Sequence, residues 1–205
     1  MHDSQSSPEI RRQLRQLRRT ISCAEREQWD GEIANHLIRS PWLRRSSRVA
    51  SYLAQDGEVS LHGLHLSLFS SVNKRLYLPV LKPGTRLGFA PFEMQTPLLA
   101  NRFGIPEPHS QERLPARFLS LVLVPLVGFD EQGHRLGMGA GYYDRSFAFA
   151  RDPQAHKRPW LIGVGYELQR CDALPVQPWD VPLDGVVTEK GLRMGLRNRS
   201  GAGEE

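Results

Sequence analysis

A glycine-rich stretch with aromatic and charged neighbours is the part of the chain best suited to chemistry. Residues 133–145 read Gly-His-Arg-Leu-Gly-Met-Gly-Ala-Gly-Tyr-Tyr-Asp-Arg, and they follow the apolar run 119–127. Glycines at 137, 139 and 141 can take positive φ, so successive backbone N–H groups can turn toward a bound anion. The residues from 142 to 151 resemble the first turns of a helix. The stretch therefore predicts an anion cradle built from a strand, a glycine loop and a helix N-terminus.

Charged side chains around this loop indicate that the anion is a phosphate. Asp144 supplies a carboxylate that can hold a divalent cation beside phosphate oxygens. Arg135 and Arg145 flank the loop with positive charge. The spacing G-x-G-x-G-Y-Y-D matches neither the dinucleotide-binding fingerprint nor the P-loop. A plain structural turn is the alternative, and the flanking charges favour phosphate binding over it.

The composition is that of an ordinary globular protein. The chain has 205 residues, of which 40% are hydrophobic and 24% charged, enough for one sizeable α/β domain. No apolar stretch approaches the roughly 20 residues that span a bilayer, and the basic N-terminus lacks the apolar core of a secretory signal. Cys23 and Cys171 match no metal-ligand spacing. We expect a cytoplasmic enzyme that makes no contact with membranes.

The net charge of +5 favours anionic partners. Its excess lies largely near the ends of the chain, and arginines are dense between residues 11 and 19. No aromatic-interleaved basic strand and no helix-turn-helix pattern accompanies these arginines. We therefore expect no nucleic acid partner, and a phosphorylated small molecule is the better match.

The glycine loop must be positioned by elements that begin with two helices. Ser6 with Glu9, and Ser22 with Glu25, both resemble capping boxes. The second helix should end at Ser40, and a third should cover residues 61–69. The buried stripe of the first helix should consist of Ile10, Leu14, Leu17 and Ile21.

Apolar segments that alternate with these helices predict the fold class. Residues 76–81 and 87–92 should form a hairpin, and residues 93–117 a long loop. Strands alternating with helices predict a single three-layer α/β/α domain with a mostly parallel central sheet and a small antiparallel addition. The strands are expected at residues 49–54, 76–81, 87–92, 119–127, 160–164 and 185–188.

The domain is expected to span residues 8–197, between a flexible N-terminus (1–7) and a disordered tail (198–205). Open sheets of this kind bind ligands outside the carboxyl ends of their strands. Glu58 and the glycine loop follow such ends, whereas Asp184 precedes its strand.

Several motifs, in this order, make the chain similar to a known family. They resemble 5-formyltetrahydrofolate cyclo-ligase, also called methenyltetrahydrofolate synthetase, over roughly residues 8 to 190. The long glycine motif that ends in Tyr-Tyr-Asp is the specific part. The motifs are Arg11-x-x-x-Arg15, Glu58, the segment 101–108 (Asn-Arg-Phe-Gly-Ile-Pro-Glu-Pro), the segment 125–130 (Pro-Leu-Val-Gly-Phe-Asp), the segment 135–144 and Asp184.

The resemblance implies an activity that the residues can be tested against. The family uses ATP and Mg²⁺ to convert 5-formyltetrahydrofolate into 5,10-methenyltetrahydrofolate, ADP and phosphate, through phosphorylation of the formyl oxygen. Phosphoryl transfer requires positioning and charge neutralisation more than a covalent nucleophile. The resemblance thus implies a small-molecule folate substrate, ATP and Mg²⁺, and we expect a monomer.

The resemblance also implies roles for individual residues. Asp144 and Asp184 would hold Mg²⁺, and Arg135 and Arg145 would stabilise the transferred charge. Glu58 would accept hydrogen bonds from the N–H groups of the pterin. Folate would be lined by Leu53, Phe103, Pro106 and Tyr143. The nucleotide would be bound by Arg11, Arg15, Arg135, Leu136, Gly137, Met138, Gly139, Ala140, Gly141, Tyr142 and Tyr143.

The loop departs from the family pattern at two positions. Met138 and Ala140 stand where members often carry basic residues, so Arg135, Arg145 and the N-terminal arginines must supply more of the neutralising charge. Two other classes of function remain open. One is a non-catalytic basic module that binds RNA or a phosphorylated metabolite. The other is a sugar-phosphate isomerase or transferase on a related scaffold, because fold does not determine chemistry.

Overall fold

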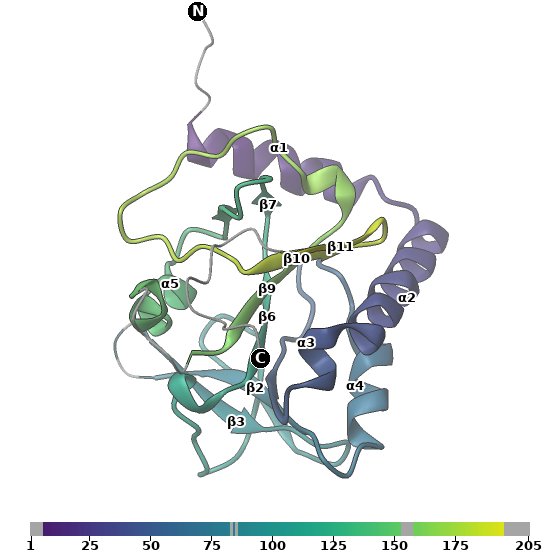
Figure 1. The fold of residues 1–205 in the computed structure, drawn as a ribbon, viewed down its shortest axis with the longest axis vertical. Coiled ribbons are helices and arrows are strands. Elements are labelled where there is room, and N and C mark those ends of the chain that lie inside the picture. The colour runs from purple at the N-terminus through teal and green to yellow at the C-terminus, as the bar shows by residue number, and fades with distance from the viewer. Residues whose placement is uncertain (1–5, 83, 85, 153–157, 195–205) are drawn as a thin grey trace, which may run out of the picture.

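The computed structural model describes residues 6–82, 84, 86–152 and 158–194, and in these ranges a seven-stranded sheet forms the centre of the molecule (Figure 1). Its strand order is β11-β10-β9-β6-β1-β2-β3. The five inner strands are parallel, and each edge strand pairs antiparallel with its neighbour. The mostly parallel sheet is thereby confirmed. The strands are β1 (Arg48–Ala50), β2 (Arg75–Leu81), β3 (Leu87–Pro91), β6 (Leu121–Pro125), β9 (Trp160–Val164), β10 (Gly185–Thr188) and β11 (Gly191–Met194).

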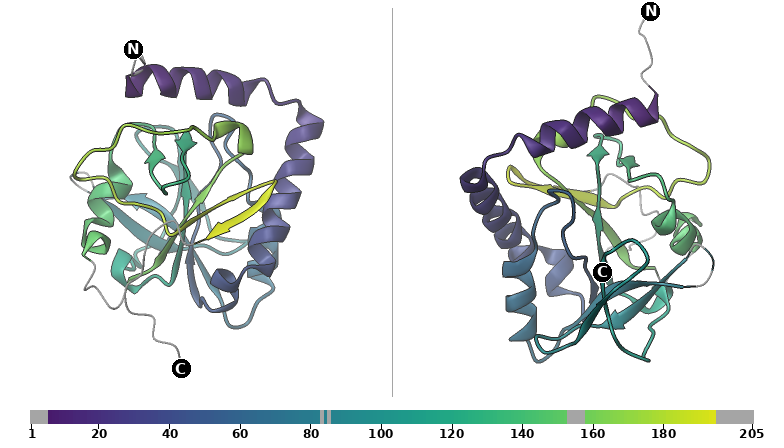
Figure 2. Two further views of the ribbon diagram at one scale, coloured as in Figure 1. Left: turned by 45° about the horizontal axis from the view of Figure 1, so that its top comes forward. Right: turned by 180° about the vertical axis from the view of Figure 1, so that it is seen from behind.

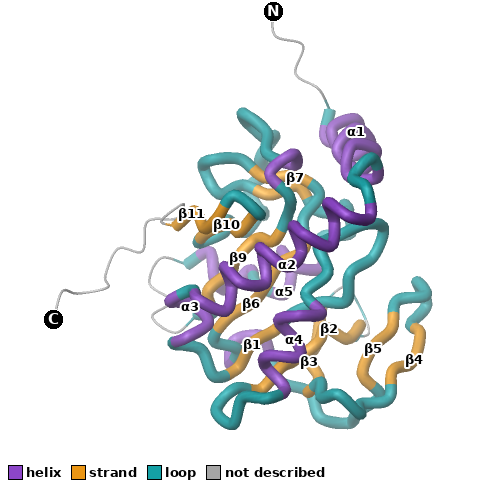
Figure 3. The backbone as a smooth tube through the Cα atoms, turned by 90° about the vertical axis from the view of Figure 1, so that its right-hand side faces the viewer, coloured by secondary structure: helices purple, strands orange, loops and turns teal. Residues whose placement is uncertain are grey.

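Helical segments cover both faces of this sheet, which confirms the three layers. The helices α2 (Cys23–Arg39), α3 (Pro41–Arg44) and α4 (His62–Phe69) pack on one face, as seen from their side in Figure 3. The short helix α5 (Tyr142–Ser146) and the 3₁₀ turn η2 (Ala148–Arg151) lie on the other face. Side chains of β6 alternate between two buried apolar clusters, as the period of a strand requires.

Local signals explain where α2 and its neighbours begin and end. Ser22 and Glu25 form the expected capping box of α2. Ile33 and Leu37 face the core and are fully buried. Ser40 ends α2, and its hydroxyl accepts a hydrogen bond from the Leu43 N–H (3.1 Å), so the same residue also caps α3.

The first helix, α1 (Ser7–Arg19), lies across one end of the sheet (Figure 2). The predicted apolar stripe is only partly correct: Ile10 and Leu14 are half-buried, with Leu14 packed over Gly128, and neither is part of the buried core. Leu17 is 44% exposed, and Arg18 is the buried residue of α1, whose residues are all described. Ile21 is buried, but it lies beyond the end of the helix. Ser6 makes no side-chain cap, so its predicted capping box is also absent. The physical reason is that α1 covers the polar end of the sheet and not an apolar face.

Other departures fall where the chain leaves the sheet. The expected loop 93–117 contains a hairpin of β4 (Leu98–Ala100) and β5 (Pro106–Pro108), followed by the 3₁₀ turn η1 (Ala116–Phe118). A second small hairpin, β7 (Gly128–Phe129) with β8 (Arg135–Leu136), precedes the glycine loop. A third 3₁₀ turn, η3 (Glu167–Gln169), follows β9. β1 and β6 are shorter than expected because their last predicted residues turn into loops.

The structure differs from the expected domain bounds at the start of the chain. Ser7 already belongs to α1, so the helix begins inside the segment expected to be flexible. The expected tail 198–205 lies outside the described residues. Within the described ranges, none of the helices has the length and apolar character that crossing a membrane requires.

Candidate functional site

A cavity of about 870 Å³ opens at the carboxyl ends of the central strands. From β1 the chain crosses through α4 to β2 on one side, and it later continues from β6 to β9 on the other. The order of strands therefore reverses between β1 and β6, and ligands bind at such a point in open α/β sheets. Tyr52 and Leu53, which follow β1, and Pro125, which ends β6, line the cavity.

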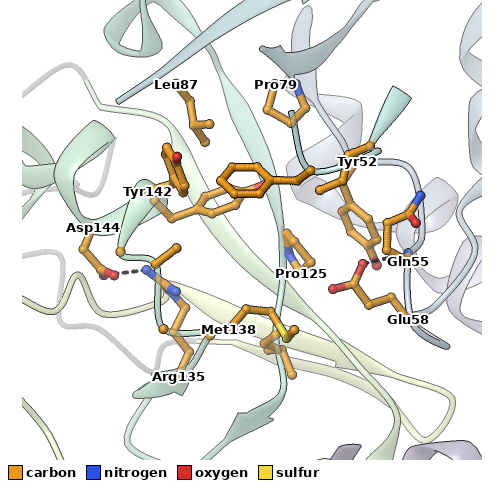
Figure 4. Close-up of a pocket in the computed structure, with 18 of the residues that line it drawn as sticks. Tyr52, Gln55, Glu58, Pro79, Leu87, Pro125, Arg135, Met138, Tyr142 and Asp144 are labelled. Atoms are coloured by element: carbon orange, nitrogen blue, oxygen red, sulfur yellow. Dashed lines mark hydrogen bonds and ion pairs between the residues drawn. The ribbon is translucent and has the colours of Figure 1, made fainter. Parts of the chain in front are cut away.

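Apolar side chains form one broad wall of this cavity (Figure 4). They come from the loop after β1, from the β2–β3 hairpin, from the β4–β5 hairpin and from the end of β6. Leu53, Phe103 and Pro106 were expected to line a flat ring system, and all three lie here. Such a wall suits a flat apolar ligand more than a sugar. Its members are Leu53, Leu78, Pro79, Leu81, Leu87, Phe103, Ile105, Pro106, Pro125 and Leu126.

The β4–β5 hairpin is held between the sheet and the glycine loop. The Oε1 of Glu107 accepts hydrogen bonds from the Leu81 N–H (2.9 Å) and from Nδ2 of Asn101 (2.7 Å). At the tip of the hairpin, Nη2 of Arg102 donates to the hydroxyl of Tyr142 (2.8 Å). The hairpin is therefore a fixed part of the cavity wall.

Glu58 lies in the cavity beside Tyr52 and Gln55, as Figure 4 shows. Its Oε2 accepts a hydrogen bond from the Gln55 N–H (3.0 Å). Burial raises the pKa of Glu58, and the bond from Gln55 and the positive charge of Arg18 offset this only in part. An ionised carboxylate in such a partly desolvated position is a strong acceptor for ligand N–H groups.

The glycine loop, residues 137–141, presents unpaired backbone donors. Gly139 and Gly141 have φ of 96° and 65°, conformations that other residues rarely adopt. The Gly137 carbonyl accepts a hydrogen bond from Nε of Arg11 (2.7 Å), and the Ala140 carbonyl accepts one from Arg145. Within the described part of the chain, none of the N–H groups of residues 138–141 donates to a protein acceptor. The carbonyls are thus occupied while the donors remain available to an anion.

Guanidinium groups surround this loop at close range. A Cβ atom placed on Gly139 would lie 3.5 Å from Cζ of Arg11, and one on Gly141 would lie 2.7 Å from Nη1 of Arg145. One on Gly137 would lie 3.3 Å from Nη1 of Arg135. The glycines therefore allow the guanidinium groups of Arg11, Arg135 and Arg145 to approach the backbone of a loop that has no basic residue at positions 138 and 140.

The two predicted metal ligands lie apart. Asp144 lines the cavity, where its Oδ1 accepts hydrogen bonds from Nη2 of Arg135 (2.5 Å) and from the Val181 N–H (3.2 Å). Asp184 is 2% exposed and lies at the amino end of β10. The structure does not bring Asp184 into the cavity with Asp144, because the direction of β10 places Asp184 at the amino end of that strand, whereas the cavity lies at the carboxyl ends of the central strands.

The partners of Asp184 indicate a structural role. Its carboxylate pairs with Nη1 of Arg158 (3.0 and 3.1 Å) and accepts a hydrogen bond from the Leu161 N–H (2.9 Å). Among the described residues, no group of three or more His, Cys, Asp or Glu side chains is arranged to hold a metal ion by itself.

Two of the predicted arginines do not line the main cavity. Nε of Arg15 binds Oδ2 of Asp56 (2.7 Å), so Arg11 is the arginine of the α1 pair that reaches the cavity. Arg145 lines an adjoining cavity of about 300 Å³ together with Arg151. Both cavities border Gly139, Gly141, Asp144 and Trp179.

Two tyrosines, Tyr142 and Tyr143, directly follow the glycine loop. Burial raises the pKa of Tyr143, and the charge of Glu58 raises it further, so the phenol stays protonated. Tyr143 lines the main cavity together with Glu58 and Arg135. Tyr142 instead contacts the β4–β5 hairpin, and its ring lies 6.4 Å from that of Phe103.

Sequence reasoning missed several residues of the cavity. Tyr52 directly precedes the predicted Leu53, so its place after a strand was the available signal. Trp179, which is 60% exposed, and Asp180 also line the cavity. They lie in a proline-rich link without periodicity, where no sequence signal indicates a ligand-facing side chain.

Comparisons with known proteins agree on one family. The sequence model of the 5-formyltetrahydrofolate cyclo-ligase family matches residues 3–189. The 5-formyltetrahydrofolate cyclo-ligase of Haemophilus influenzae is 36% identical over 185 residues, which cover 88% of this chain and 96% of that protein. The Escherichia coli enzyme of the same name is 36% identical over 179 residues, covering 85% and 96%.

A solved structure gives the same result for the fold. The NMR structure of the 5,10-methenyltetrahydrofolate synthetase of Aquifex aeolicus superposes with a TM-score of 0.80 at 32% identity. The superposition covers 97% of this chain and 96% of that one.

Proposed function

Because this chain belongs to the 5-formyltetrahydrofolate cyclo-ligase family, we propose that it converts 5-formyltetrahydrofolate into 5,10-methenyltetrahydrofolate with ATP and Mg²⁺. One observation carries the proposal. A single cavity combines an apolar wall and a half-buried acceptor, Glu58, with a cationic glycine loop in which the N–H groups of residues 138–141 are unpaired among the described residues. The apolar wall and Glu58 are complementary to a flat pterin, and the glycine loop is complementary to a phosphate chain.

The chemistry follows from the poor leaving ability of a formamide oxygen. Transfer of the γ-phosphoryl group from ATP to the formyl oxygen gives ADP and an activated carbon. The neighbouring folate nitrogen attacks that carbon, closes the five-membered ring and, with loss of its proton, expels inorganic phosphate. The protein must hold both substrates in line and neutralise the transferred charge.

The nucleotide is assigned to the glycine loop. The triphosphate would accept hydrogen bonds from the N–H groups of residues 138–141, within the stretch from Arg135 to Tyr143 that was assigned to ATP. Arg11 and Arg135 supply positive charge from the main cavity, and Arg145 supplies it from the adjoining one. Arg15 would not contact the nucleotide directly, because it pairs with Asp56 and does not line the cavity.

The folate is assigned to the other half of the cavity. Glu58 would accept hydrogen bonds from the amino and ring N–H groups of the pterin, beside Leu53 and Tyr143. Phe103 and Pro106, from the β4–β5 hairpin, would cover the ring system. The protonated Tyr143 phenol lies near Glu58 and Arg135, between the two substrates.

The residues of the cavity also fit a magnesium ion bound together with ATP. Mg²⁺ is usually held by one or two carboxylates, substrate phosphates and water. Asp144 borders the loop, and Asp180 lines the same cavity and can replace Asp184 as a second carboxylate. When bound, the ion would neutralise charge on the phosphate oxygens.

The decisive test is formation of the methenyl product. The purified chain with 5-formyltetrahydrofolate, ATP and Mg²⁺ should produce the absorbance of methenyltetrahydrofolate and release one phosphate per turnover. Asp144→Asn should mainly reduce metal-dependent turnover. No product at high enzyme concentration, with active substrate, would contradict the proposal.

The half-buried carboxylate of Glu58 gives this test a dependence on pH. Because the pKa of Glu58 is raised, protonation should begin to weaken folate binding at a higher pH than for an ordinary glutamate. Glu58→Gln should weaken folate binding about tenfold or more, the cost of losing a charged acceptor, and should remove this pH dependence. ATP binding should change little.

A control for this substitution comes from a surface ion pair. Glu131 binds exposed Arg170 (2.6 Å) and does not line the cavity. Glu131→Gln should leave folate binding and its pH profile unchanged. If Glu58→Gln behaved in the same way, the assignment of the pterin to Glu58 would be wrong.

The alternative functions fit the structure less well. Arg15, Arg18 and Arg19 are paired with Asp56, which reduces the basic surface available to RNA. The apolar wall suits a phosphosugar poorly. We place the reaction in the cytoplasm, where free thiols such as Cys23 and Cys171 persist.

A further inference from the structure

One carboxylate binds three arginines of α1. Oδ2 of Asp56 pairs with Nε of Arg15 (2.7 Å) and Nη2 of Arg18 (3.3 Å), and Oδ1 pairs with Nη2 of Arg19 (2.5 Å). The backbone carbonyl of Asp56 accepts a further hydrogen bond from Nη2 of Arg18 (2.7 Å). The carboxyl half of α1 is thus docked by charge onto the loop that precedes Glu58.

The backbone of this loop is shaped for that contact. Asp56 has a φ of 48°, and within the described ranges no other non-glycine residue has a positive φ. Aspartate tolerates this conformation better than most residues. Gly57 follows with a φ of 77°, and its carbonyl accepts a hydrogen bond from Nη1 of Arg26 in α2 (2.6 Å). The loop is therefore fastened to α2 while Asp56 faces α1.

The other half of α1 reaches the glycine loop. Arg11 precedes Arg18 by about two helical turns, roughly 10 Å along the helix, and its Nε donates to the Gly137 carbonyl (2.7 Å). The Arg11 guanidinium also packs over Gly139. One helix consequently connects the loop of Glu58 with the loop assigned to the nucleotide.

We propose that Asp56 is a positioning residue for nucleotide binding, which docks α1 so that Arg11 lies on the glycine loop. The inference rests on the proposed function, because it takes the glycine loop as the nucleotide site. Asp56 itself lines the cavity near Glu58, and its effect on the nucleotide passes through α1.

The burial of Arg18 explains why the carboxylate controls the helix. The Arg18 side chain is fully buried, and its Nε has no hydrogen-bond partner. Loss of the Asp56 charge would remove the one carboxylate that is ion-paired with Arg18 among the described residues and leave only the more distant charge of Glu58 to balance a buried cation, which is unfavourable. Leu17 is exposed on the same helix and Ile10 and Leu14 are only half-buried, so α1 has no fully buried apolar side chain to oppose a shift that would hydrate Arg18. Such a shift displaces Arg11 as well.

The test compares Asp56→Asn with the unchanged full chain. Affinity for a non-hydrolysable ATP analogue with Mg²⁺ should fall about tenfold, the loss typical of a misplaced charged contact. Amide hydrogen exchange should become faster in α1 but not in α2. Glu131→Gln, which removes a carboxylate from another arginine pair, should change neither measurement.

A double-mutant cycle separates positioning from general destabilisation. In an Arg11→Ala background, Asp56→Asn should weaken nucleotide binding by less than about twofold, because both substitutions remove the same contact. Losses that multiply in full would show that Asp56 acts independently of Arg11, and would overturn the proposal.

A milder variant guards against misfolding of Asp56→Asn. Arg19→Gln removes one of the three pairs at an exposed side chain and should produce smaller changes in the same direction. If the unchanged chain bound no nucleotide, the proposed function would fall together with this inference. If it bound nucleotide while exchange in α1 was the same in all variants, this inference alone would be overturned.

Discussion

Two consecutive helices, α1 and α2, are held to the molecule by opposite means. α2 buries Ile33, Ala34 and Leu37 against the sheet and begins with a complete capping box. α1 buries Arg18 and no apolar side chain, and its arginines bind Asp56 and backbone carbonyls of the neighbouring loops. α2 therefore contributes to the stability of the fold, whereas α1 places the charge of Arg11 at the cavity that we assign to the substrates.

The difference shows the limit of helical periodicity as a guide to burial. The apolar spacing of α1 predicts a buried stripe as clearly as the pattern of α2 does. Periodicity indicates which residues share a face, but it does not show what that face meets. α1 lies at the edge of the cavity, which Arg11 lines. An arginine at this position can interact with an anionic ligand, whereas a leucine cannot.

The largest contrast should come from shortening one leucine in each helix. Leu37→Ala should lower the free energy of unfolding by about 2–5 kcal/mol, because it leaves a cavity in the core. Leu17→Ala, at an exposed position, should change it by less than about 0.5 kcal/mol. Urea unfolding measures both. Equal losses would show that α1 is packed as firmly as α2.

A buried histidine, His65, lies in α4, which packs on the same face of the sheet as α2. Its titration tests how strongly this layer excludes water. Nε2 of His65 in α4 bonds Oγ of Ser51 (2.8 Å), and burial, with a smaller effect of His62, lowers the pKa of His65 from 6.5 to about 4. The unfolded chain takes up a proton in this interval and the folded one does not. The contribution to stability is complete above pH 6.5 and is lost as the pH falls toward 4, by up to about 3 kcal/mol.

The control for this prediction is His65→Gln, which keeps a side chain able to bond Ser51 and cannot take up a proton in this range. Urea unfolding at about pH 7 and about pH 4.5 should show a smaller loss for the variant than for the unchanged chain. Equal losses would indicate that other groups cause the acid sensitivity.

The smallest contrast concerns the two serines that precede the helices. Ser22→Ala should cost about 1 kcal/mol, because it removes a side-chain cap from α2. Ser6→Ala should cost only a few tenths of a kcal/mol, since Ser6 makes no cap in α1. Thermal unfolding of the two variants compares them, and the reverse order would contradict the assigned caps.

Features that depend on distant partners were not predicted from the sequence, whereas several local features were, although Ser6 and Glu9 carry the same local signal as Ser22 and Glu25 and form no capping box. The α2 cap and the glycines that need positive φ were identified because neighbouring residues determine them. The role of Arg15 was not, because its partner Asp56 is 41 positions away in the chain. The place of Asp184 depends on the direction of β10 in the sheet, which its own sequence does not show.

The β4–β5 hairpin shows the same limit. Its strands are three residues each and contain prolines, and they are stabilised by Glu107 bonding to Leu81 in a different sheet. No alternating pattern marks them. This segment, which contributes Phe103, Ile105 and Pro106 to the cavity wall, therefore resembled a loop.

Trp179 has a practical consequence as a built-in optical reporter. It is 60% exposed where the two cavities meet, whereas Trp42 is buried in the core. Iodide should quench its fluorescence selectively, and a molecule that settles in either cavity should shield it. Replacing the other tryptophans with phenylalanine would leave a single emitter that reads occupancy directly, without a turnover assay.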